Sequence, residues 1–312
     1  MPDVGGARER IAPHLAATPV LRSTCLGERI GTRLLLKCEN LQKTGSFKVR
    51  GALNTVLQLG ADERARGVVT ISAGNHAQAL AWAAGTAGIP CTVVMPRSAS
   101  PLKAEASRGY GAEVVLHGDV FHAFEHARTL ERERGLTFVH PFDDERIIAG
   151  QGTVGLEILE QAAGVDVIVV PLGGGGLIAG IASAVAARNA AVRIYGVEPE
   201  GAAAMRKSLD AGHAVRLDRV ETVADGLAPP MAGERTFELV RQHVEDVVLV
   251  DDREILDALR VILARAKLLT EPAGAAAVAA LLAGRIPVRP GETVVAVLSG
   301  GNVGVEELRG ML

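Results

Sequence analysis

The sequence predicts an α/β protein in which parallel β-sheets are covered by helices on both faces. Short runs of β-branched and other apolar residues alternate along the chain with alanine-rich stretches of helical character. Uninterrupted apolar runs are typical of strands buried on both faces of a parallel sheet. Three of these runs end in a turn rich in glycine, serine or asparagine, at TISAGNH, PLGGGGL and VLSGGN. Because ligands collect where parallel strands end, the three turns predict one shared pocket.

The predicted elements follow one another in strand–helix order from residue 67. The strands are GVVTIS (67–72), PCTVVMP (90–96), AEVVLHG (112–118), FVHP (138–141), DVIVVPL (166–172), VRIYGVEP (192–199) and ETVVAVLSGGN (292–302). The helices are HAQALAWAAGTAG (76–88), the segments from Ser100 to Arg108 and from Val120 to Arg134, and IAGIASAVAARN (178–189).

A further amphipathic helix begins after Asp251. Glu254 stands three residues later, as in a capping box. Four apolar residues then share one face of the helix, namely Ile255, Leu259, Ile262 and Ala266. We expect this helix to serve as scaffold, and we expect the prolines at 229–230 to stiffen a loop.

Composition sets limits on the class of protein. The chain has 312 residues, 48% of them hydrophobic, which allows one large domain or two closely coupled ones. A net charge of -3 gives no basic surface for nucleic acid. No apolar run reaches the roughly 20 residues of a membrane helix, and the charged N-terminus does not resemble a signal peptide. The scattered cysteines Cys25, Cys38 and Cys91 favour a reducing cytoplasm.

The turn PLGGGGLIAG (171–180) predicts a phosphate site. Its glycines let backbone N–H groups approach an anion, and the following helix N-terminus adds partial positive charge. One alternative is a turn that serves close packing only. Another is a dinucleotide site, because Gly174, Gly176 and Ala179 match the G-x-G-x-x-A fingerprint and Glu198 ends the next strand.

The segment NLQKTGSFKVRGALN (40–54) places Lys48 at the start of a helix that we expect to run to about Leu59, capped by Ser46 or Thr44. A cation is unfavourable at this end of a helix. The position is explained if the Lys48 amine reacts in its neutral form, because a Schiff-base nucleophile needs a lowered pKa. Lys43 is near enough to compete for this role, and an exposed lysine is the alternative without chemistry.

Four motifs carry a resemblance to a known family. GSFKVRGA (45–52) closely resembles the cofactor-lysine motif of the threonine dehydratase and serine racemase family of pyridoxal-phosphate enzymes. SAGNHAQ (72–78), the glycine turn at 173–177 and SGGN (299–302) resemble its other motifs, in the same order along nearly the whole chain. The resemblance implies the two-domain tryptophan-synthase-β (fold type II) architecture. It implies a large cofactor-binding domain, 1–66 and 145–312, with a small domain, 67–144, inserted and closing over the substrate.

The resemblance also implies a role for each motif residue. Lys48 would carry pyridoxal 5'-phosphate and act as acid and base on one face of the substrate. The other cofactor-binding residues would be Phe47 and Gly226 beside the ring, Asn75 at its hydroxyl, Ser299 at its nitrogen, and Gly173, Gly174, Gly175, Gly176 and the Leu177 N–H at the phosphate. Ser72, Gly74 and His76 would hold the substrate carboxylate. Gln151 is a less favoured candidate for the substrate site.

The implied activity is that of a homodimeric ammonia-lyase, which converts a β-hydroxy amino acid such as L-threonine or L-serine to a 2-keto acid and ammonia. Racemases of the family place a serine two residues before the motif asparagine, where this chain has Ala73. Alanine cannot carry a proton, which favours dehydration over racemisation. The arginine that contacts substrate in some racemases falls on Phe124.

Two further departures concern metal and regulation. Some members bind a divalent cation through a glutamate, a carbonyl and an aspartate. Glu198 and Ala202 match the first two positions, but Ala204 replaces the aspartate, so we expect no well-bound metal. The chain ends ten residues after Asn302, so we also expect no C-terminal regulatory domain.

Several alternatives remain open from the sequence alone. The enzyme could be a racemase, or a dehydratase of a hydroxyaspartate or hydroxyectoine pathway. The dinucleotide fingerprint allows an NAD-dependent oxidoreductase. A third alternative is a non-catalytic binding protein that has retained the pocket but no longer catalyses a reaction.

Overall fold

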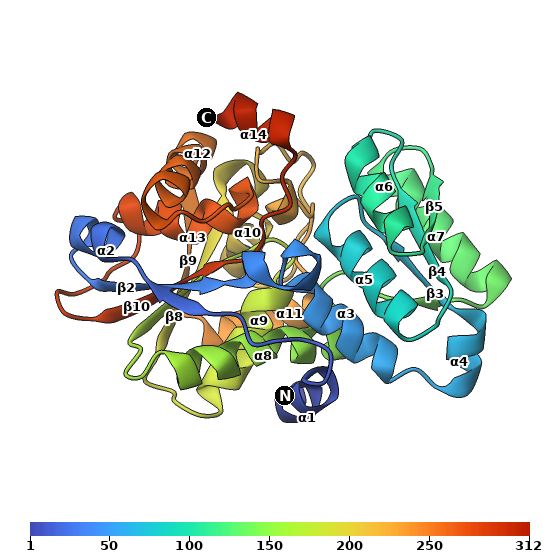
Figure 1. The fold of residues 1–312 in the computed structure, drawn as a ribbon, viewed down its shortest axis with the longest axis horizontal. Helices are drawn as coiled ribbons and strands as arrows, with labels where there is room; N and C mark the ends of the chain where they lie inside the picture. The colour runs from blue at the N-terminus through green and yellow to red at the C-terminus, as the bar shows by residue number, and fades with distance from the viewer.

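The computed structural model describes residues 1–312 and arranges them in two lobes, each built on its own sheet (Figure 1). The larger sheet has the strand order β1 (Val20–Arg22), β2 (Arg33–Cys38), β10 (Thr293–Leu298), β7 (Val167–Pro171), β8 (Arg193–Pro199) and β9 (Asp246–Val250). The smaller sheet has the order β5 (Glu113–Leu116), β4 (Cys91–Met95), β3 (Val68–Ile71) and β6 (Thr137–Phe138). All neighbouring strands are parallel except β1 and β2, which pair antiparallel.

Fourteen α-helices surround the two sheets. They are α1 (Val4–Ile11), α2 (Thr24–Ile30), α3 (Lys48–Leu57), α4 (Ala61–Arg66), α5 (Asn75–Thr86), α6 (Pro101–Gly109), α7 (Val120–Arg134), α8 (Glu145–Gln161), α9 (Gly176–Ala186), α10 (Ala204–Ala211), α11 (Glu234–His243), α12 (Asp252–Val261), α13 (Pro272–Leu282) and α14 (Val305–Met311). Short 3-10 turns lie at η1 (Glu39–Leu41), η2 (Lys43–Gly45), η3 (Glu200–Ala202) and η4 (Asp225–Leu227), and a π-helical turn, η5 (Ile262–Ala266), follows α12. None of the helices is long and apolar enough to cross a membrane.

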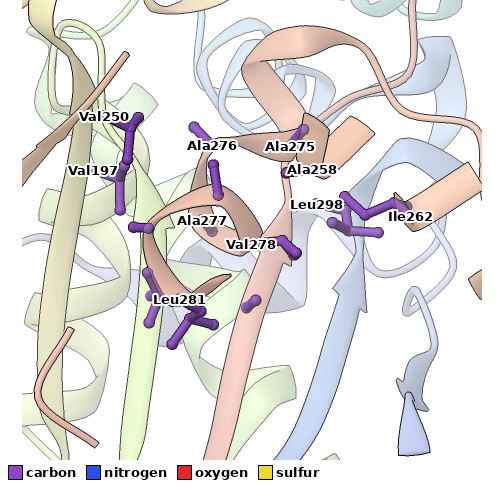
Figure 2. Packing of buried hydrophobic residues seen from close by; sticks show 14 of the residues in the cluster. Val197, Val250, Ala258, Ile262, Ala275, Ala276, Ala277, Val278, Leu281 and Leu298 are labelled. Carbon is purple, nitrogen blue, oxygen red and sulfur yellow. The ribbon is translucent and has the colours of Figure 1, made fainter. Parts of the chain in front are cut away.

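Alternate residues of each strand face different helical layers, as expected for buried parallel strands. In the smaller sheet, Val93 belongs to the core beneath α5, whereas Val94 belongs to the core beneath α7. The larger sheet packs in the same way between α12 and α13 on one side and α8 and α9 on the other. Figure 2 shows α13 against the strands of the larger sheet, where a run of alanines (275–277) allows a close approach.

Helix α3 connects the two lobes. It packs against α5 of the smaller lobe and against α8 of the larger one, and it lies between them in Figure 1. Buried residues of α3, such as Leu53, share one hydrophobic cluster with strand β4 and with Ile147 of α8. The helix that begins with Lys48 is therefore fixed by both lobes.

The predicted α/β class is confirmed, and the predicted helices and strands are present with one exception. The strand predicted over 138–141 is instead the two-residue β6, which shares only Phe138 with that range. Helix α7 has the predicted bounds, and Asp251 and Glu254 form the predicted capping box. Some predictions were wrong in detail. Helix α3 ends at Leu57, and its N-cap is Phe47, because Ser46 is extended and pairs with Gly300 in a β-bridge. The helix after Asp251 changes to the π-helical turn at Ile262.

We propose that the domain boundaries fall where the sequence places them, with a small domain over 67–144 inserted in a large one over 1–66 and 145–312. The strands of the smaller sheet all lie within 68–138, and those of the larger sheet lie outside this range. The shared core under α3 makes the division less complete than two separate sheets would suggest.

Candidate active site

A cavity of about 710 Å3 lies where strands of both sheets end, and residues of both lobes line it. Ile71 at the end of β3 and Pro171 at the end of β7 both contribute to its wall. The predicted cofactor-binding residues and the three residues predicted to hold the substrate carboxylate all line this one cavity: Phe47, Lys48, Ser72, Gly74, Asn75, His76, Gly173, Gly174, Gly175, Gly176, Leu177, Gly226 and Ser299. Ala73 and Phe124 line it as well, whereas Lys43 and Gln151 do not.

Two lysines line the cavity, Lys48 and Lys103. The Nζ of Lys48 donates a hydrogen bond to the carbonyl oxygen of Pro141 at 2.9 Å. Burial lowers the pKa of the Lys48 amine to about 8, and the nearby carboxyl of Glu271 acts weakly in the opposite direction. Lys103 is instead paired with Asp225 at 3.0 Å. Lys48 is therefore the amine that is suited to act as a nucleophile.

The four-glycine turn leads from β7 into α9, and its backbone has no room for side chains. Gly175 has a φ of +92°, and a Cβ at Gly174 would collide with the ring of Phe142. The backbone N–H groups of residues 173–178 donate to no acceptor within the chain. Unpaired amides at the N-terminus of a buried helix attract an anion, so the turn fits a phosphate. Close packing and anion binding thus both require these glycines.

The loop of Ser72 to His76 begins helix α5. The Oγ of Ser72 accepts a hydrogen bond from the Gly74 N–H at 3.2 Å, which shapes the turn. The imidazole of His76 lies 3.4 Å from the carbonyl oxygen of Val139 through Nε2, and its Nδ1 has no partner. Burial lowers the pKa of His76 to about 3, so this histidine is neutral at physiological pH.

The lysine loop and the final strand turn are tied together. The Phe47 N–H donates to the Ser299 carbonyl at 3.1 Å, and the Gly301 N–H donates to the Gly45 carbonyl at 2.9 Å. The hydroxyl of Ser299 makes no hydrogen bond within the chain and is available in the cavity. Gly226 belongs to η4, and a side chain there would press on Ala273.

The structure adds residues to the cavity that sequence reasoning missed. His140 accepts hydrogen bonds at Nδ1 from the N–H groups of Phe142 and Asp143, at 3.2 and 2.8 Å. Its proton therefore lies on Nε2, and burial lowers its pKa to about 4. No local pattern marks a histidine of this kind. Glu271 was also missed, although Pro272 directly after it marks the start of a helix.

Two residues considered from the sequence have structural partners elsewhere. The Oε1 of Gln151 accepts from the Gly51 N–H at 3.2 Å, which joins α8 to α3. Glu198 is fully buried outside the cavity, and it accepts from the N–H groups of Met205 and Arg206, both at 2.8 Å. Because Glu198 caps α10, it is not free to bind a ribose, which argues against the dinucleotide alternative. No group of three or more potential metal ligands occurs in the structure.

The chain is similar to known proteins over nearly its whole length. A family model described as pyridoxal-phosphate dependent enzyme matches residues 11–300. An L-threonine ammonia-lyase of Thermotoga maritima is 46% identical over 304 residues, which cover 97% of this chain and 75% of the relative. Among solved structures, a threonine deaminase of T.th. has 44% identity and a TM-score of 0.91, covering 97% of this chain and 98% of that one. Maize serine racemase has 38% identity and a TM-score of 0.95, covering 99% and 95%.

The four motifs, their convergence on one cavity and these matches agree on one family. The dependence on pyridoxal phosphate that the resemblance implied is a property of that family. The chain belongs to the pyridoxal-phosphate dependent enzymes of fold type II.

Proposed function

We propose that this chain is an ammonia-lyase that eliminates water from a small β-hydroxy amino acid such as L-threonine or L-serine. A water molecule then displaces ammonia from the resulting imine, so the net products are a 2-keto acid and ammonia. One observation carries the proposal: the Lys48 amine and the unpaired amides of the glycine turn face the same cavity. Relatives named as threonine ammonia-lyase and threonine deaminase support this choice of reaction.

Pyridoxal phosphate, when bound, supplies the electron sink that makes the substrate α-proton acidic and the β-hydroxyl a leaving group. The amides of 173–177 would hold its phosphate. Asn75 and Ser299 would hydrogen-bond its ring oxygen and nitrogen. A hydroxyl at Ser299, unlike a carboxylate, leaves that nitrogen uncharged. The Nζ of Lys48 would take the α-proton on one face and return a proton to the departing hydroxyl.

The opposite face of the substrate has no proton carrier at position 73. Ala73 lines the cavity two residues before Asn75, and its methyl group cannot donate or accept a proton. Racemisation needs a donor on the second face, whereas elimination needs only the first. We therefore favour elimination, even though a serine racemase is among the similar structures.

A keto-acid release assay over a panel of hydroxy amino acids tests the proposal. L-Threonine, L-serine and 3-hydroxyaspartate are compared, and D-serine formation is followed in parallel. We expect keto acid from at least one substrate, none from Lys48→Ala, and a borohydride-fixed cofactor on Lys48. If no hydroxy amino acid gives product, or if the fixed label lies on another residue, the proposal is wrong.

We also propose that the enzyme needs no divalent metal. Both oxygens of Glu198 are engaged by backbone N–H groups, and position 204 has no carboxylate. Turnover should be unchanged after chelation with EDTA and after addition of Mg2+. A loss of activity that Mg2+ restores would contradict this proposal.

We further propose that the enzyme works as a homodimer in the cytoplasm. The three cysteines are unpaired, with two of them buried, as is usual in a reducing compartment. The homodimer rests on the family resemblance, and sedimentation velocity of the purified protein would test it. A monomer at working concentration would contradict it.

A further inference from the structure

Glu271 is a buried carboxyl that lines the cavity and has no role in the proposed reaction. It stands at the N-cap of α13 and is only 8% exposed. Its N–H donates to the Gly300 carbonyl at 3.1 Å, and a Cβ at Gly300 would collide with its Oε1. The carboxyl therefore lies against the glycine that follows Ser299. A buried carboxyl is costly to fold unless it has a polar partner.

Its hydrogen-bond partner is Asn75, from the other lobe. The Nδ2 of Asn75 donates to Oε1 of Glu271 at 2.6 Å, and the Oδ1 of Asn75 accepts from Nδ2 of Asn302 at 2.8 Å. Asn302 is itself held by the Thr44 carbonyl at 2.7 Å. These contacts fix which end of the Asn75 amide is oxygen and which is nitrogen. One N–H of Asn75 remains unused.

We propose that Glu271 is a positioning residue, which orients the Asn75 amide so that its remaining N–H is presented to the ring oxygen of the cofactor. The inference rests on the proposed function, since it requires pyridoxal phosphate in this cavity. Without Glu271, the amide can rotate and present its oxygen instead, which would repel an electron-rich ring oxygen. The hydrogen bond joins α5 to the start of α13, so it also sets the distance between the lobes at this point.

The role does not depend on one protonation state of Glu271. The charged groups that act on it are Lys103, Asp225 and Glu307, together with the Lys48 amine, and none of them donates a hydrogen bond to its carboxyl. Burial raises the pKa of Glu271 to about 7, while the hydrogen bond from Asn75 lowers it. Both the ionised and the protonated carboxyl keep an oxygen that can accept from Asn75.

Cofactor binding to the full-length apoprotein tests this inference through a readout other than turnover. We compare Glu271→Ala, Glu271→Met, Glu271→Gln and Asn75→Ala by pyridoxal-phosphate affinity and by the absorption spectrum of the bound cofactor. Met fills the volume of Glu without the acceptor, so it remains informative if the alanine variant does not fold. The exposed Glu306 provides a matched control as Glu306→Ala.

We expect Glu271→Ala and Glu271→Met to weaken cofactor affinity about ten-fold and to shift the spectrum as Asn75→Ala does. Glu271→Gln should restore both, because its amide oxygen can accept from Asn75. The double variant Glu271→Ala with Asn75→Ala should be no weaker than Asn75→Ala alone. Glu306→Ala should match the wild type.

Additive losses in the double variant, or a Glu271→Gln as weak as Glu271→Ala, would overturn the inference. Wild-type affinity in both Glu271→Ala and Glu271→Met would overturn it too. A wild-type apoprotein that takes up no pyridoxal phosphate would instead overturn the proposed function, and the inference with it. The wild-type titration therefore separates the two failures.

Discussion

The amine of Lys48 has surroundings that alter its chemistry. Its pKa is lowered to about 8 by burial, so roughly one amine in ten is neutral at pH 7, far more than for an ordinary lysine. The hydrogen bond to the Pro141 carbonyl holds the amine within the cavity rather than in bulk water. A neutral, oriented amine is what attack on an aldehyde requires.

Covalent uptake of pyridoxal phosphate by the apoprotein should therefore depend on pH. We predict a rate that rises about ten-fold per pH unit below pH 8 and levels off above it, because the amine is then neutral. Stopped-flow absorbance measures this rate. Lys43→Ala is the matched control and should behave as the wild type, since Lys43 is exposed. A rate still rising ten-fold per unit above pH 9 would indicate an ordinary lysine.

Position 73 should decide the fate of the substrate once its α-proton has been removed. For Ala73→Ser, we predict that D-serine appears from L-serine, because a hydroxyl then stands on the second face of the substrate. Chiral chromatography of the reaction mixture measures this product. Ala73→Gly lacks the hydroxyl and should form none. If the serine variant yields only keto acid, a proton carrier at position 73 is not sufficient for racemisation.

At the scale of the elements, the glycine turn and Phe142 form one packed unit. We predict that Gly174→Ala weakens cofactor affinity at least ten-fold, because its Cβ would displace the Phe142 ring and with it the turn. Fluorescence titration of the apoprotein measures this affinity. Gly109→Ala is a suitable control, since a Cβ there meets nothing within 4 Å. Unchanged affinity in Gly174→Ala would show that the turn tolerates displacement.

The elements differ in how readily sequence predicts them. Helix α7 carries strong end signals, with Asp119 as its cap and Gly135 in the left-handed conformation after it, so both of its bounds are predicted correctly. The N-cap of α3 is not predicted correctly, because Ser46 is held in an extended conformation by its pairing with Gly300, which is far away in the sequence. The edge strand β1 has only three residues, too few to show the alternation of apolar and polar residues that predicts a strand.

The same distinction holds for the candidate site. Contiguous motifs, such as those around Lys48 and Asn75, are visible in the sequence because glycines and polar residues interrupt apolar runs. Glu271 acts through Asn75, which is distant along the chain, so no local pattern singles it out. His140 is bonded to its neighbours Phe142 and Asp143, and only the fold brings it to the cavity wall. Only the packed structure brings these side chains together.

At the scale of the whole molecule, the core under α3 couples the two lobes. We predict that Leu53→Ala costs about 3 kcal/mol and speeds amide hydrogen exchange in both α5 and α8, because Leu53 is fully buried in the cluster that they share. Leu281→Ala is the matched control. It lies in the separate core under α13, shown in Figure 2, and should leave α5 unaffected.

Exchange measured by mass spectrometry distinguishes these outcomes. Faster exchange in only one of α5 and α8 after Leu53→Ala would show that the lobes unfold separately. Faster exchange in both would show that α5 and α8 are stabilised together through α3, the helix that begins with Lys48.

The unpaired amides of 173–178 are suited to any tetrahedral anion, because N–H groups at a helix N-terminus attract negatively charged oxygens whatever group carries them. Inorganic phosphate and sulfate meet the same description. Apoprotein prepared in phosphate or sulfate buffer should therefore bind pyridoxal phosphate slowly. Transfer to a buffer without tetrahedral anions should increase the rate of binding.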